Sequence, residues 1–387
     1  MTTRVALVCS GLGTVRRGYE AFAQGLFDAL SGVEGLDVWL FKGAGARTPR
    51  EIPLWHLPRS GFPARLTGEL TRRGPYVMEQ ATLTVSLIPW LRKTRPDVVY
   101  YCDPSIGRLL WQWRKLTGPQ FRLIMHNGGP HPPPFRWADH VHQLTPVTLT
   151  EALSAGVPPE RQTLLPCGFS FGPPPQPMSM YERSTRRRAL GLPVDRPLVL
   201  SVGALNRGHK RMDYLITEIA SMGEARPFLV MLGESEDDTP AVRALAELLL
   251  GPEGFQMRTV PRERMDEYYR AADVFALASL TEAFGLAYVE ALAHGLPTIA
   301  HDQEVTRFVM GKEGTLADLR RPDALAAAVR TVLQEGDRGA DRERRHEVMR
   351  ARFGWPALLP GYVTMLAPSD RAQAPAPRAP VAAGVAG

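Results

Sequence analysis

Cysteine is scarce in this sequence, and the few cysteines form no recognisable pattern. The 387-residue chain has three of them, Cys9, Cys102 and Cys167, with no Cys-x-x-Cys spacing. Disulfide frameworks and structural zinc sites both depend on several regularly spaced cysteines. We therefore predict no metal site, and we expect a protein of a reducing, cytoplasmic compartment.

Long apolar runs are also lacking. No stretch of the sequence approaches the roughly 18 consecutive apolar residues that a membrane-spanning helix needs. The apolar run at residues 4–10 is shorter than the core of a secretory signal, and it reaches Gly11 before any cleavage-like site. We therefore interpret residues 4–10 as a strand and expect a soluble protein that is at most associated with a membrane surface.

The composition has no extreme, but the charge is unevenly distributed. With 44% hydrophobic and 22% charged residues, the sequence is typical of a globular protein rather than a disordered or collagen-like one. The net charge is +6, and residues 1–170 alone carry 19 Lys and Arg against 12 Asp and Glu. Such a basic half would attract an anionic membrane, a nucleic acid or a phosphorylated substrate, although solvated surface charge explains it equally well.

Strand-like and helix-like patterns alternate along the chain. Residues 4–10 lead through a Gly-x-Gly turn into a segment whose apolar residues recur at helical spacing over residues 19–30. A helix is expected over residues 78–93, and Pro89 should kink or end it. Further strands are expected at 37–41, 98–101, 122–126, 198–203, 228–233, 257–260 and 274–279. The alternation predicts the α/β class with two doubly wound parallel sheets.

The pattern divides the chain into two domains and a tail. We place the N-terminal domain at residues 1–171 and the C-terminal domain at 172–366, the latter with C-terminal helices over 341–352 and 355–365. Residues 367–387 are mostly Ala, Pro, Gly and Arg, and we expect them to be disordered. Ligands of open α/β sheets bind at the carboxyl ends of the strands, so we expect a cleft between the domains to hold the site.

The most specific pattern is the segment 279–297, Ser-Leu-Thr-Glu-Ala-Phe-Gly-Leu-Ala-Tyr-Val-Glu-Ala-Leu-Ala-His-Gly-Leu-Pro. A strand ends here, a short loop carries Glu282, and a helix that begins near residue 284 carries Glu290 about two turns later. Backbone N–H groups at the start of a helix suit a phosphate, because the helix dipole lies behind them. The expected donors are those of Phe284, Gly285 and Leu286.

The Glu-x7-Glu pattern with Phe-Gly inside it resembles the retaining nucleotide-sugar glycosyltransferases that have two facing Rossmann-like domains, the GT-B fold. The resemblance is to glycosyltransferase family 4, also described as glycosyl transferases group 1. Residues 198–216 are similar to the family's Val-Gly-x-Leu…Lys segment, and Leu-Pro-Cys-Gly at 165–168 is similar to its interdomain turn. The resemblance implies that the N-terminal domain is the acceptor side and that the C-terminal domain binds the nucleotide-sugar donor.

The resemblance also implies roles for charged residues. Glu290 would accept hydrogen bonds from the ribose hydroxyls of the donor, and Glu282 would hold hydroxyls of the transferred sugar. Lys210, together with Arg207, would hold the diphosphate and neutralise the charge that develops on the leaving group. The family usually has Arg at the position of Ala204, so Arg207 is expected to substitute from the loop. The alternative for Arg207 is an ordinary surface charge.

Four further residues are assigned on the same basis. Gly11 and Gly13 would bring the donor diphosphate or an acceptor close to the backbone, although a tight turn explains them equally well. His126 ends a strand before Asn-Gly-Gly, and we expect it to bind a sugar hydroxyl. Val260 lies where the family's nucleotide base meets backbone atoms, which leaves UDP, GDP and ADP open.

The predicted reaction moves a sugar from a nucleotide diphosphate sugar to an unknown hydroxyl acceptor, with retention at the anomeric carbon. Cell-envelope glycans, glycolipids and small metabolites are all candidate products. No Asp-x-Asp motif stands at a suitable strand end, and the resemblance implies a metal-independent enzyme without a cofactor. The leaving phosphate would take the proton of the acceptor, and neither Glu282 nor Glu290 is expected to act as a nucleophile.

Other interpretations stay open. Nucleotide-sugar 2-epimerases share the two-domain architecture, although the Glu-x7-Glu spacing argues against them, and Ala204 is compatible with an inactive nucleotide-sugar-binding scaffold. A dinucleotide oxidoreductase is disfavoured because the third glycine of its fingerprint is missing.

Partners beyond the donor and the acceptor are expected to be few. Peripheral association with an anionic membrane is one, since basic residues flank apolar ones in the N-terminal half, although the helix over residues 78–93 has the composition of plain core as well. The basic residues concerned are Arg16, Arg17, Arg72, Arg73, Arg92 and Lys93. We predict no nucleic-acid partner.

Overall fold

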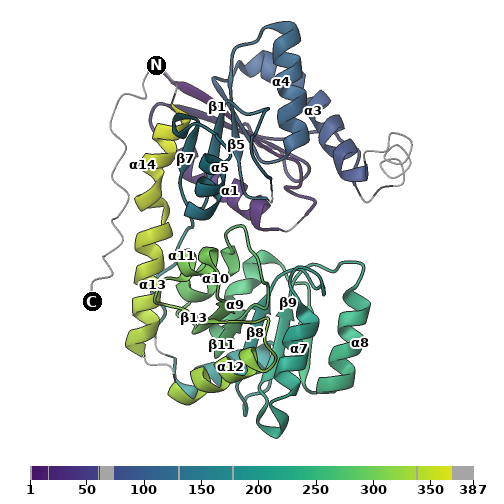
Figure 1. The fold of residues 1–387 in the computed structure, drawn as a ribbon, viewed down its shortest axis with the longest axis vertical. Helices are drawn as coiled ribbons and strands as arrows, with labels where there is room; N and C mark the ends of the chain where they lie inside the picture. The colour runs from purple at the N-terminus through teal and green to yellow at the C-terminus, as the bar shows by residue number, and fades with distance from the viewer. Residues whose placement is uncertain are drawn as a thin grey trace. The chain divides into compact units, whose positions relative to one another are not determined.

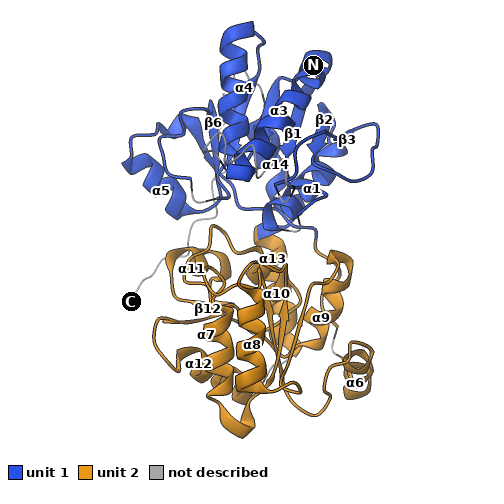
Figure 2. Cartoon of the chain, turned by 90° about the vertical axis from the view of Figure 1, so that its right-hand side faces the viewer, with its two compact units in different colours: residues 1–170, 353–387 blue, residues 171–352 orange. Residues whose placement is uncertain are grey.

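A computed structural model describes residues 2–15, 17–59, 61, 74–129, 131–176, 178–336 and 339–367 of the chain. The chain divides into two compact units, residues 1–170 with 353–387 (unit 1) and residues 171–352 (unit 2), as Figure 2 shows. Three of the basic residues noted above, Arg16, Arg72 and Arg73, lie outside the described residues, as does the predicted tail from residue 368 onward.

Unit 1 is built on a seven-stranded parallel sheet of order β3-β2-β1-β4-β5-β6-β7. Its strands are β1 Thr3–Cys9, β2 Leu36–Lys42, β3 Glu51–Pro53, β4 Val98–Tyr101, β5 Arg122–His126, β6 His140–Gln143 and β7 Gln162–Leu164. Its helices are α1 Gly18–Ser31, α3 Gly74–Thr94, α4 Pro104–Thr117, α5 Pro146–Ser154 and α14 Trp355–Leu366 (Figure 1). The strand order is that of a doubly wound Rossmann-like sheet, with β1 beside both β2 and β4.

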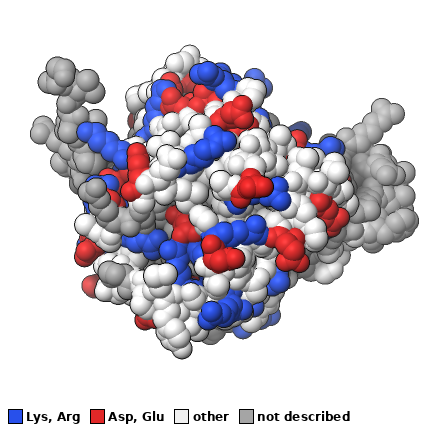
Figure 3. All heavy atoms as spheres, turned by 90° about the horizontal axis from the view of Figure 1, so that it is seen from below, with Lys and Arg blue, Asp and Glu red and all other residues white. Residues whose placement is uncertain are grey.

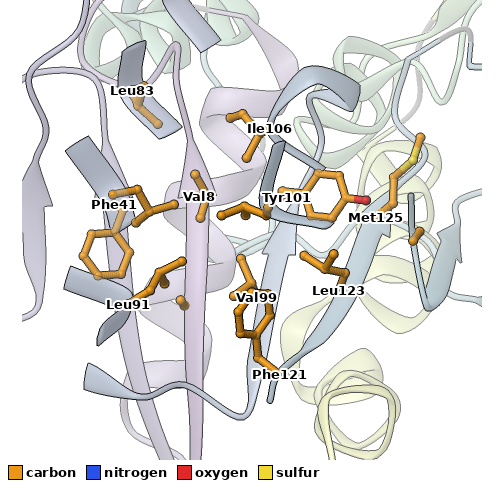
Figure 4. Packing of buried hydrophobic residues seen from close by; sticks show 14 of the residues in the cluster. Val8, Phe41, Leu83, Leu91, Val99, Tyr101, Ile106, Phe121, Leu123 and Met125 are labelled. Carbon is orange, nitrogen blue, oxygen red and sulfur yellow. The ribbon is translucent and has the colours of Figure 1, made fainter. Parts of the chain in front are cut away.

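One apolar core of unit 1 lies between the sheet and α3 with α4. Leu83, Leu87 and Leu91 recur every four residues along α3, so they share one helix face, and all three are buried. They pack with side chains from the strands, among them Val8 and Val99 (Figure 4). Burial of this kind stabilises each large aliphatic side chain by about 1.5–3 kcal/mol, so the helical spacing in the sequence determines which faces meet.

Pro89 does not end its helix. α3 runs from Gly74 to Thr94 and contains Pro89 within it. Pro89 is exposed, whereas the buried leucines of α3 lie on the core face. The helix continues because its apolar face is held by the core, and tertiary packing outweighs the loss of one backbone hydrogen bond.

Unit 2 is built on a six-stranded parallel sheet of order β10-β9-β8-β11-β12-β13. Its strands are β8 Leu198–Val202, β9 Phe228–Leu232, β10 Phe255–Arg258, β11 Val274–Ala276, β12 Thr298–His301 and β13 Thr315–Ala317. Its helices are α6 Met180–Ala189, α7 Met212–Ala220, α8 Thr239–Leu250, α9 Met265–Ala271, α10 Leu286–Ala293, α11 Glu304–Met310, α12 Ala324–Glu335 and α13 Gly339–Phe353. The predicted α/β class with two doubly wound parallel sheets is confirmed.

The last helix corrects the predicted domain assignment. We placed residues 355–365 with the C-terminal domain, but α14 belongs to unit 1. The Tyr362 hydroxyl donates to the Pro166 carbonyl at 2.7 Å, and Arg122 of β5 donates to the Met365 carbonyl at 3.0 Å. The Trp355 ring lies 6.2 Å from that of Phe22 on α1. Such contacts across about 200 residues leave no local signal, so chain order assigned the helix to the wrong unit.

Candidate functional site

The loop between β8 and α7 positions Lys210. The side-chain oxygen of Asn206 accepts from the Lys210 backbone N–H at 2.8 Å, and its amide donates to Glu236 at 2.7 Å, which closes the loop. The Lys210 side chain lies across Gly203, where a Cβ would come within 3.1 Å of its Cδ and Cε. The glycine that follows β8 therefore makes room for the lysine to lie at the carboxyl edge of the sheet.

Lys210 meets Glu282 in a largely buried ion pair. Lys210 Nζ lies 2.5 Å from Glu282 Oε1, and the two side chains are 16% and 8% exposed. His209 Nε2 is 3.9 Å from the other carboxylate oxygen and 2.9 Å from the Thr281 carbonyl. Two residues separated by 72 positions in the sequence are thus brought together, and a cation beside a carboxylate can hold an anionic group next to a hydroxylated one.

The segment between Glu282 and α10 places a helix N-terminus beside this pair. Gly285 has φ 84° and stands at the N-cap of α10, where it has no side chain to cap the helix. A Cβ on Gly285 would lie 2.4 Å from the ring of Tyr288, so both the conformation and the space require glycine. The helix begins at Leu286, so its N-terminus, with its positive partial charge, lies at this edge of the sheet. Phe284, just before it, is buried.

Two buried hydroxyls close to this loop have no hydrogen-bond partner among the described residues, Ser279 Oγ and Tyr288 Oη. Burial raises the pKa of Tyr288 well above its usual value, and the charge of Glu282 raises it further. Tyr288 therefore stays protonated and keeps a donor available. Unsatisfied buried polar groups are uncommon in native proteins and cluster where ligands or strain are accommodated.

Glu290 lies on α10, and two side chains hold its carboxylate. Arg262 comes from the segment before α9, and Tyr269 comes from α9 itself. Tyr269 donates its hydroxyl to Glu290 Oε2 at 2.9 Å, and Arg262 donates to Oε1 at 3.2 Å. Burial, followed by the charge of Glu290, raises the pKa of Tyr269 well above its usual value, so this hydroxyl remains a donor. The carboxylate is oriented by both partners, yet its side chain keeps 22% exposure.

Arg207 and Val260 lie at the same edge but apart from the ion pair. The Arg207 backbone N–H donates to Asp238 at 2.8 Å, and its guanidinium lies 3.9 Å from the same carboxylate with the side chain 54% exposed. Val260 follows β10, next to Thr259, whose hydroxyl donates to the Gly233 carbonyl at 2.7 Å. The structure therefore pairs Lys210 with Glu282 shortly before α10, holds Glu290 with Tyr269 and Arg262, and pairs Arg207 with Asp238.

Arg211 is a residue that the sequence analysis missed. It adopts φ 50° and ψ 47° directly before α7, a left-handed conformation that is costly for a side-chain-bearing residue. Its guanidinium donates to the Leu319 carbonyl at 2.8 Å and to the Ala278 carbonyl at 3.3 Å. Arg211 thus ties the Lys210 loop to the end of β11, and the run Lys-Arg in the sequence was its sole signal.

The glycines of the first turn in unit 1 serve internal packing. A Cβ on Gly11 would lie 2.1 Å from Glu20 Oε1, and one on Gly13 would lie 2.3 Å from the Ala44 carbonyl oxygen. Gly13 also has φ 89°. The groups that approach these two glycines in the structure belong to the chain itself, and the predicted approach of a diphosphate or an acceptor stays a prediction. These contacts are sufficient to explain both glycines.

His126 lies in a buried polar cluster of unit 1. The Tyr100 hydroxyl is 2.8 Å from His126 Nδ1 and 2.6 Å from His142 Nδ1, and the His126 ring stacks on Phe22 at 4.6 Å. His126 is 2% exposed, and burial, with a smaller contribution from His142, holds its pKa well below the usual value. His126 is therefore neutral, and its ring is held within the unit.

The described residues contain no group of three or more His, Cys, Asp or Glu side chains arranged to hold a metal ion. Within the same part of the chain, no helix combines the length and the apolar character needed to cross a membrane.

The family comparison matches the unit that holds the charged cluster. Residues 182–351 match the model for glycosyl transferases group 1. The chain is 35% identical over 189 residues to a D-inositol 3-phosphate glycosyltransferase of Xylanimonas cellulosilytica, covering 47% of this chain and 45% of that protein. It is 30% identical over 239 residues to the enzyme of the same name from Thermobispora bispora, covering 57% and 54%. The chain thus spans about half the length of the curated relatives it matches.

Solved structures extend the likeness to both units. Sucrose-phosphate synthase from Thermosynechococcus elongatus has a TM-score of 0.75 at 20% identity and covers 94% of this chain and 98% of its own. The Anabaena protein HepE, solved with UDP-glucose, has a TM-score of 0.73 at 15% identity and covers 94% and 99%. At such identities the likeness establishes the fold. Residues 182–351 therefore match the glycosyl transferases group 1 family, and the chain as a whole has the GT-B fold.

Proposed function

We propose that the chain is a retaining glycosyltransferase that moves a sugar from a nucleotide diphosphate sugar to the hydroxyl of an acceptor. One observation carries the proposal: the Lys210–Glu282 pair lies close to the N-terminus of α10 at the carboxyl edge of the unit 2 sheet. Both residues fall in the segment that matches the glycosyltransferase family. A donor carries a diphosphate and a sugar in one molecule, and this edge offers positive and hydroxyl-accepting groups side by side.

Each group has a role in the proposed reaction. Lys210 Nζ and the α10 N-terminus, formed by Phe284, Gly285 and Leu286, neutralise the diphosphate, most strongly when its charge rises as the glycosidic bond breaks. Glu282 accepts hydrogen bonds from hydroxyls of the sugar. Arg207, in the loop before Lys210, also helps to neutralise the diphosphate. Its side chain is 54% exposed and lies 3.9 Å from Asp238, so it can turn toward the donor.

Glu290 is proposed to bind the ribose of the donor. Its two oxygens already accept from Tyr269 and Arg262, which hold the carboxylate in one orientation while leaving it partly exposed. A carboxylate has about four acceptor positions, so two ribose hydroxyls fit beside the existing donors. Val260, after β10, is proposed to border the base.

The proposed step breaks the bond between the anomeric carbon and the donor phosphate oxygen. A bond from the acceptor oxygen to the anomeric carbon forms on the same face, and the acceptor proton passes to the departing phosphate oxygen. No carboxylate attacks the sugar. His126 and the turn at Gly11 and Gly13 are proposed to border the sugar and the acceptor. The relatives named for D-inositol 3-phosphate and the neighbour solved with UDP-glucose support a polyol acceptor and a UDP-sugar as first candidates.

Binding of the nucleotide tests the donor assignment first. We would measure thermal unfolding with UDP, GDP, ADP and their sugar conjugates, for the unaltered chain and for E290Q. A ligand at about 100 times its dissociation constant adds about 2.7 kcal/mol of stability. We expect one nucleotide to stabilise the chain and E290Q to weaken that effect. E247Q, which alters an exposed carboxylate on α8, is the matched control and should respond like the unaltered chain.

Product analysis then separates the remaining interpretations. Transfer with retention, detected by NMR of the new anomeric linkage, supports the proposal. Release of an epimerised sugar would identify an epimerase instead, and binding without turnover on any polyol acceptor would identify a scaffold. A covalent sugar adduct on Glu282 or Glu290 would overturn the proposed step.

A further inference from the structure

The ends of α3 and α4 carry four exposed cations, and a fifth lies on a loop that reaches Trp90 of α3. Arg92 and Lys93 lie in the last turn of α3, Lys115 lies in the last turn of α4, and Arg95 directly follows α3. Arg47, from the loop after β2, is exposed as well. We call these five residues the α3–α4 patch.

The two helix ends lie at the same edge of the sheet. β4 begins at Val98 soon after α3, and β5 begins at Arg122 soon after α4. These strands pair in parallel with Val98 opposite Arg122, so both helices end at the amino edge of the sheet. Gly11 and His126 lie at the carboxyl ends of β1 and β5. A partner bound to the patch would therefore leave the carboxyl edge of unit 1 accessible.

Indole rings lie beside the cations of the patch. The Arg47 guanidinium carbon is 5.2 Å from the centre of the Trp90 ring, and Lys93 Nζ is 5.4 Å from it. Arg92 of α3 lies 5.9 Å from the centre of Trp113 on α4, which joins the two helix ends. Both rings are partly buried against the core of unit 1.

An apolar side chain extends from the same place. Leu116, next to Lys115, is 85% exposed. Partly buried tryptophans, projecting cations and an exposed leucine together are typical of surfaces that lie in the interface of a bilayer, where the rings sit at headgroup level.

The cations of the patch have no acidic partners among the described residues. The ion pairs of unit 1 involve other residues, Lys42, Arg50, Arg59 and Arg114, and α4 contains no Asp or Glu at all. The field of a helix C-terminus favours one or two cations there, but it does not account for Arg47 on a loop or for the exposed Leu116.

The backbone conformation at Arg95 also indicates that the stability of the fold does not explain this cation. Arg95 has φ 46° and its N–H closes α3 on the Leu91 carbonyl at 2.9 Å. α4 ends in the same manner on Gly118, with φ 77°. Glycine is the least strained residue in this left-handed position, so the chain carries an arginine where stability favours glycine.

We infer that the α3–α4 patch docks unit 1 on an anionic lipid surface. The cations meet lipid phosphates, Trp90 and Trp113 lie at the headgroup level, and Leu116 enters the acyl boundary. The inference does not depend on the proposed glycosyl transfer, because it concerns a surface at the opposite edge of the unit 1 sheet from the candidate site residues.

Vesicle binding tests the inference directly. We would co-sediment the full chain with vesicles of phosphatidylglycerol and phosphatidylcholine, and with phosphatidylcholine alone, at low and high salt. We expect binding to the anionic vesicles, little to the neutral ones, and weakening by salt. Each cation near the surface contributes about fivefold in affinity, so R92Q/K93Q/K115Q should weaken binding about a hundredfold. R307Q/R320Q/R350Q removes the same charge from unit 2 and should retain binding.

Two single variants separate lipid docking from other causes. R95G should weaken vesicle binding while its thermal midpoint stays the same or rises, which distinguishes a lost contact from a damaged fold. L116S should weaken vesicle binding without changing retention on heparin. Equal losses in both triple variants, no binding to anionic vesicles, or binding to duplex DNA with no vesicle binding would each overturn the inference.

Discussion

The carboxyl edges of the two sheets differ although their topologies are alike. In unit 2 the edge carries two ion pairs, the largely buried Lys210–Glu282 and the more exposed Arg262–Glu290. In unit 1 the corresponding edge carries His126, which is buried and neutral against Tyr100 and His142. One sheet edge thus carries charged side chains in ion pairs, whereas the histidine at the other edge is neutral and held by polar groups of its own unit.

The difference follows from what surrounds the polar groups. One Tyr100 hydroxyl stands within hydrogen-bond distance of two imidazoles, so it can donate to one while accepting from the other. Burial removes the water that would stabilise an imidazolium, and the pKa of His142 falls to about 4. The Lys210–Glu282 pair instead places opposite charges beside each other, which offsets part of the cost of burying them. These charges suit the charged donor proposed above.

The tryptophans make the comparison measurable. All seven of them, Trp39, Trp55, Trp90, Trp111, Trp113, Trp137 and Trp355, lie in unit 1. Intrinsic tryptophan fluorescence consequently follows the unfolding of unit 1, while far-ultraviolet circular dichroism follows both units together.

The largest expected effect is on catalysis in unit 2. K210A should lower the rate of glycosyl transfer by roughly 10²–10³, because removing one group that stabilises developing charge costs about that much. Steady-state kinetics with a saturating acceptor would measure it, and K312A, which alters an exposed lysine of the same unit, is the control. An unchanged rate in K210A would mean that unit 2 does not neutralise the leaving group.

The next effect is the loss of stability of unit 1 at acid pH. The folded pKa of His142 is about 4, whereas that of the unfolded chain is about 6.5. Below pH 6.5 the unfolded chain therefore takes up a proton that the folded chain refuses. Stability is present above pH 6.5 and is lost as pH falls toward 4, by about 3 kcal/mol for this one residue.

Urea unfolding at a series of pH values, followed by tryptophan fluorescence, would measure this loss. H142Q should reduce the dependence without abolishing it, since glutamine does not titrate whereas His126 and His140 keep lowered pKa values. In unit 2, hydrogen bonding from His294 holds the pKa of Asp266 at about 2, so its contribution persists down to about pH 4 and is lost only below that. If fluorescence showed no loss between pH 6.5 and 4, the buried neutral cluster would be contradicted.

A smaller loss of stability is expected when glycines of the two units are replaced by alanine. G285A should destabilise the chain by about 2 kcal/mol, because alanine is strained at φ 84° and its Cβ would meet the Tyr288 ring. G336A shares a positive φ but its Cβ meets open space, so it isolates the conformational part. G11A should cost less than G285A, since its Cβ meets the flexible end of Glu20. Thermal unfolding would rank the three, and an equal cost for G285A and G336A would remove the Tyr288 contact from the explanation.

The smallest expected effect is at Arg207. R207Q should change the transfer rate by about threefold, because the guanidinium is half exposed and faces Asp238. The same assay as for K210A applies. A loss as large as that of K210A would show that Arg207 replaces the arginine missing at Ala204.

Much of the fold could be predicted from the sequence, because the patterns that indicate helices and strands are local. Alternating short apolar runs and helical spacings predicted both parallel sheets, and Glu-x7-Glu with Phe-Gly placed two carboxylates around one helix start. The short strands β3, β6, β7, β12 and β13 were not predicted, since three or four residues, some of them polar, carry too little pattern.

The sequence by itself therefore determined the secondary-structure elements and the residue types available at each strand end. Tertiary structure decided which of them meet: Lys210 with Glu282 across 72 residues, Tyr269 with Glu290, and α14 with unit 1 rather than unit 2. It also decided that Gly11 and Gly13 accommodate the chain's own atoms, and that His126 is neutral. These outcomes depend on distance and burial, which are set by packing between segments far apart in the sequence, and no spacing along the chain encodes them.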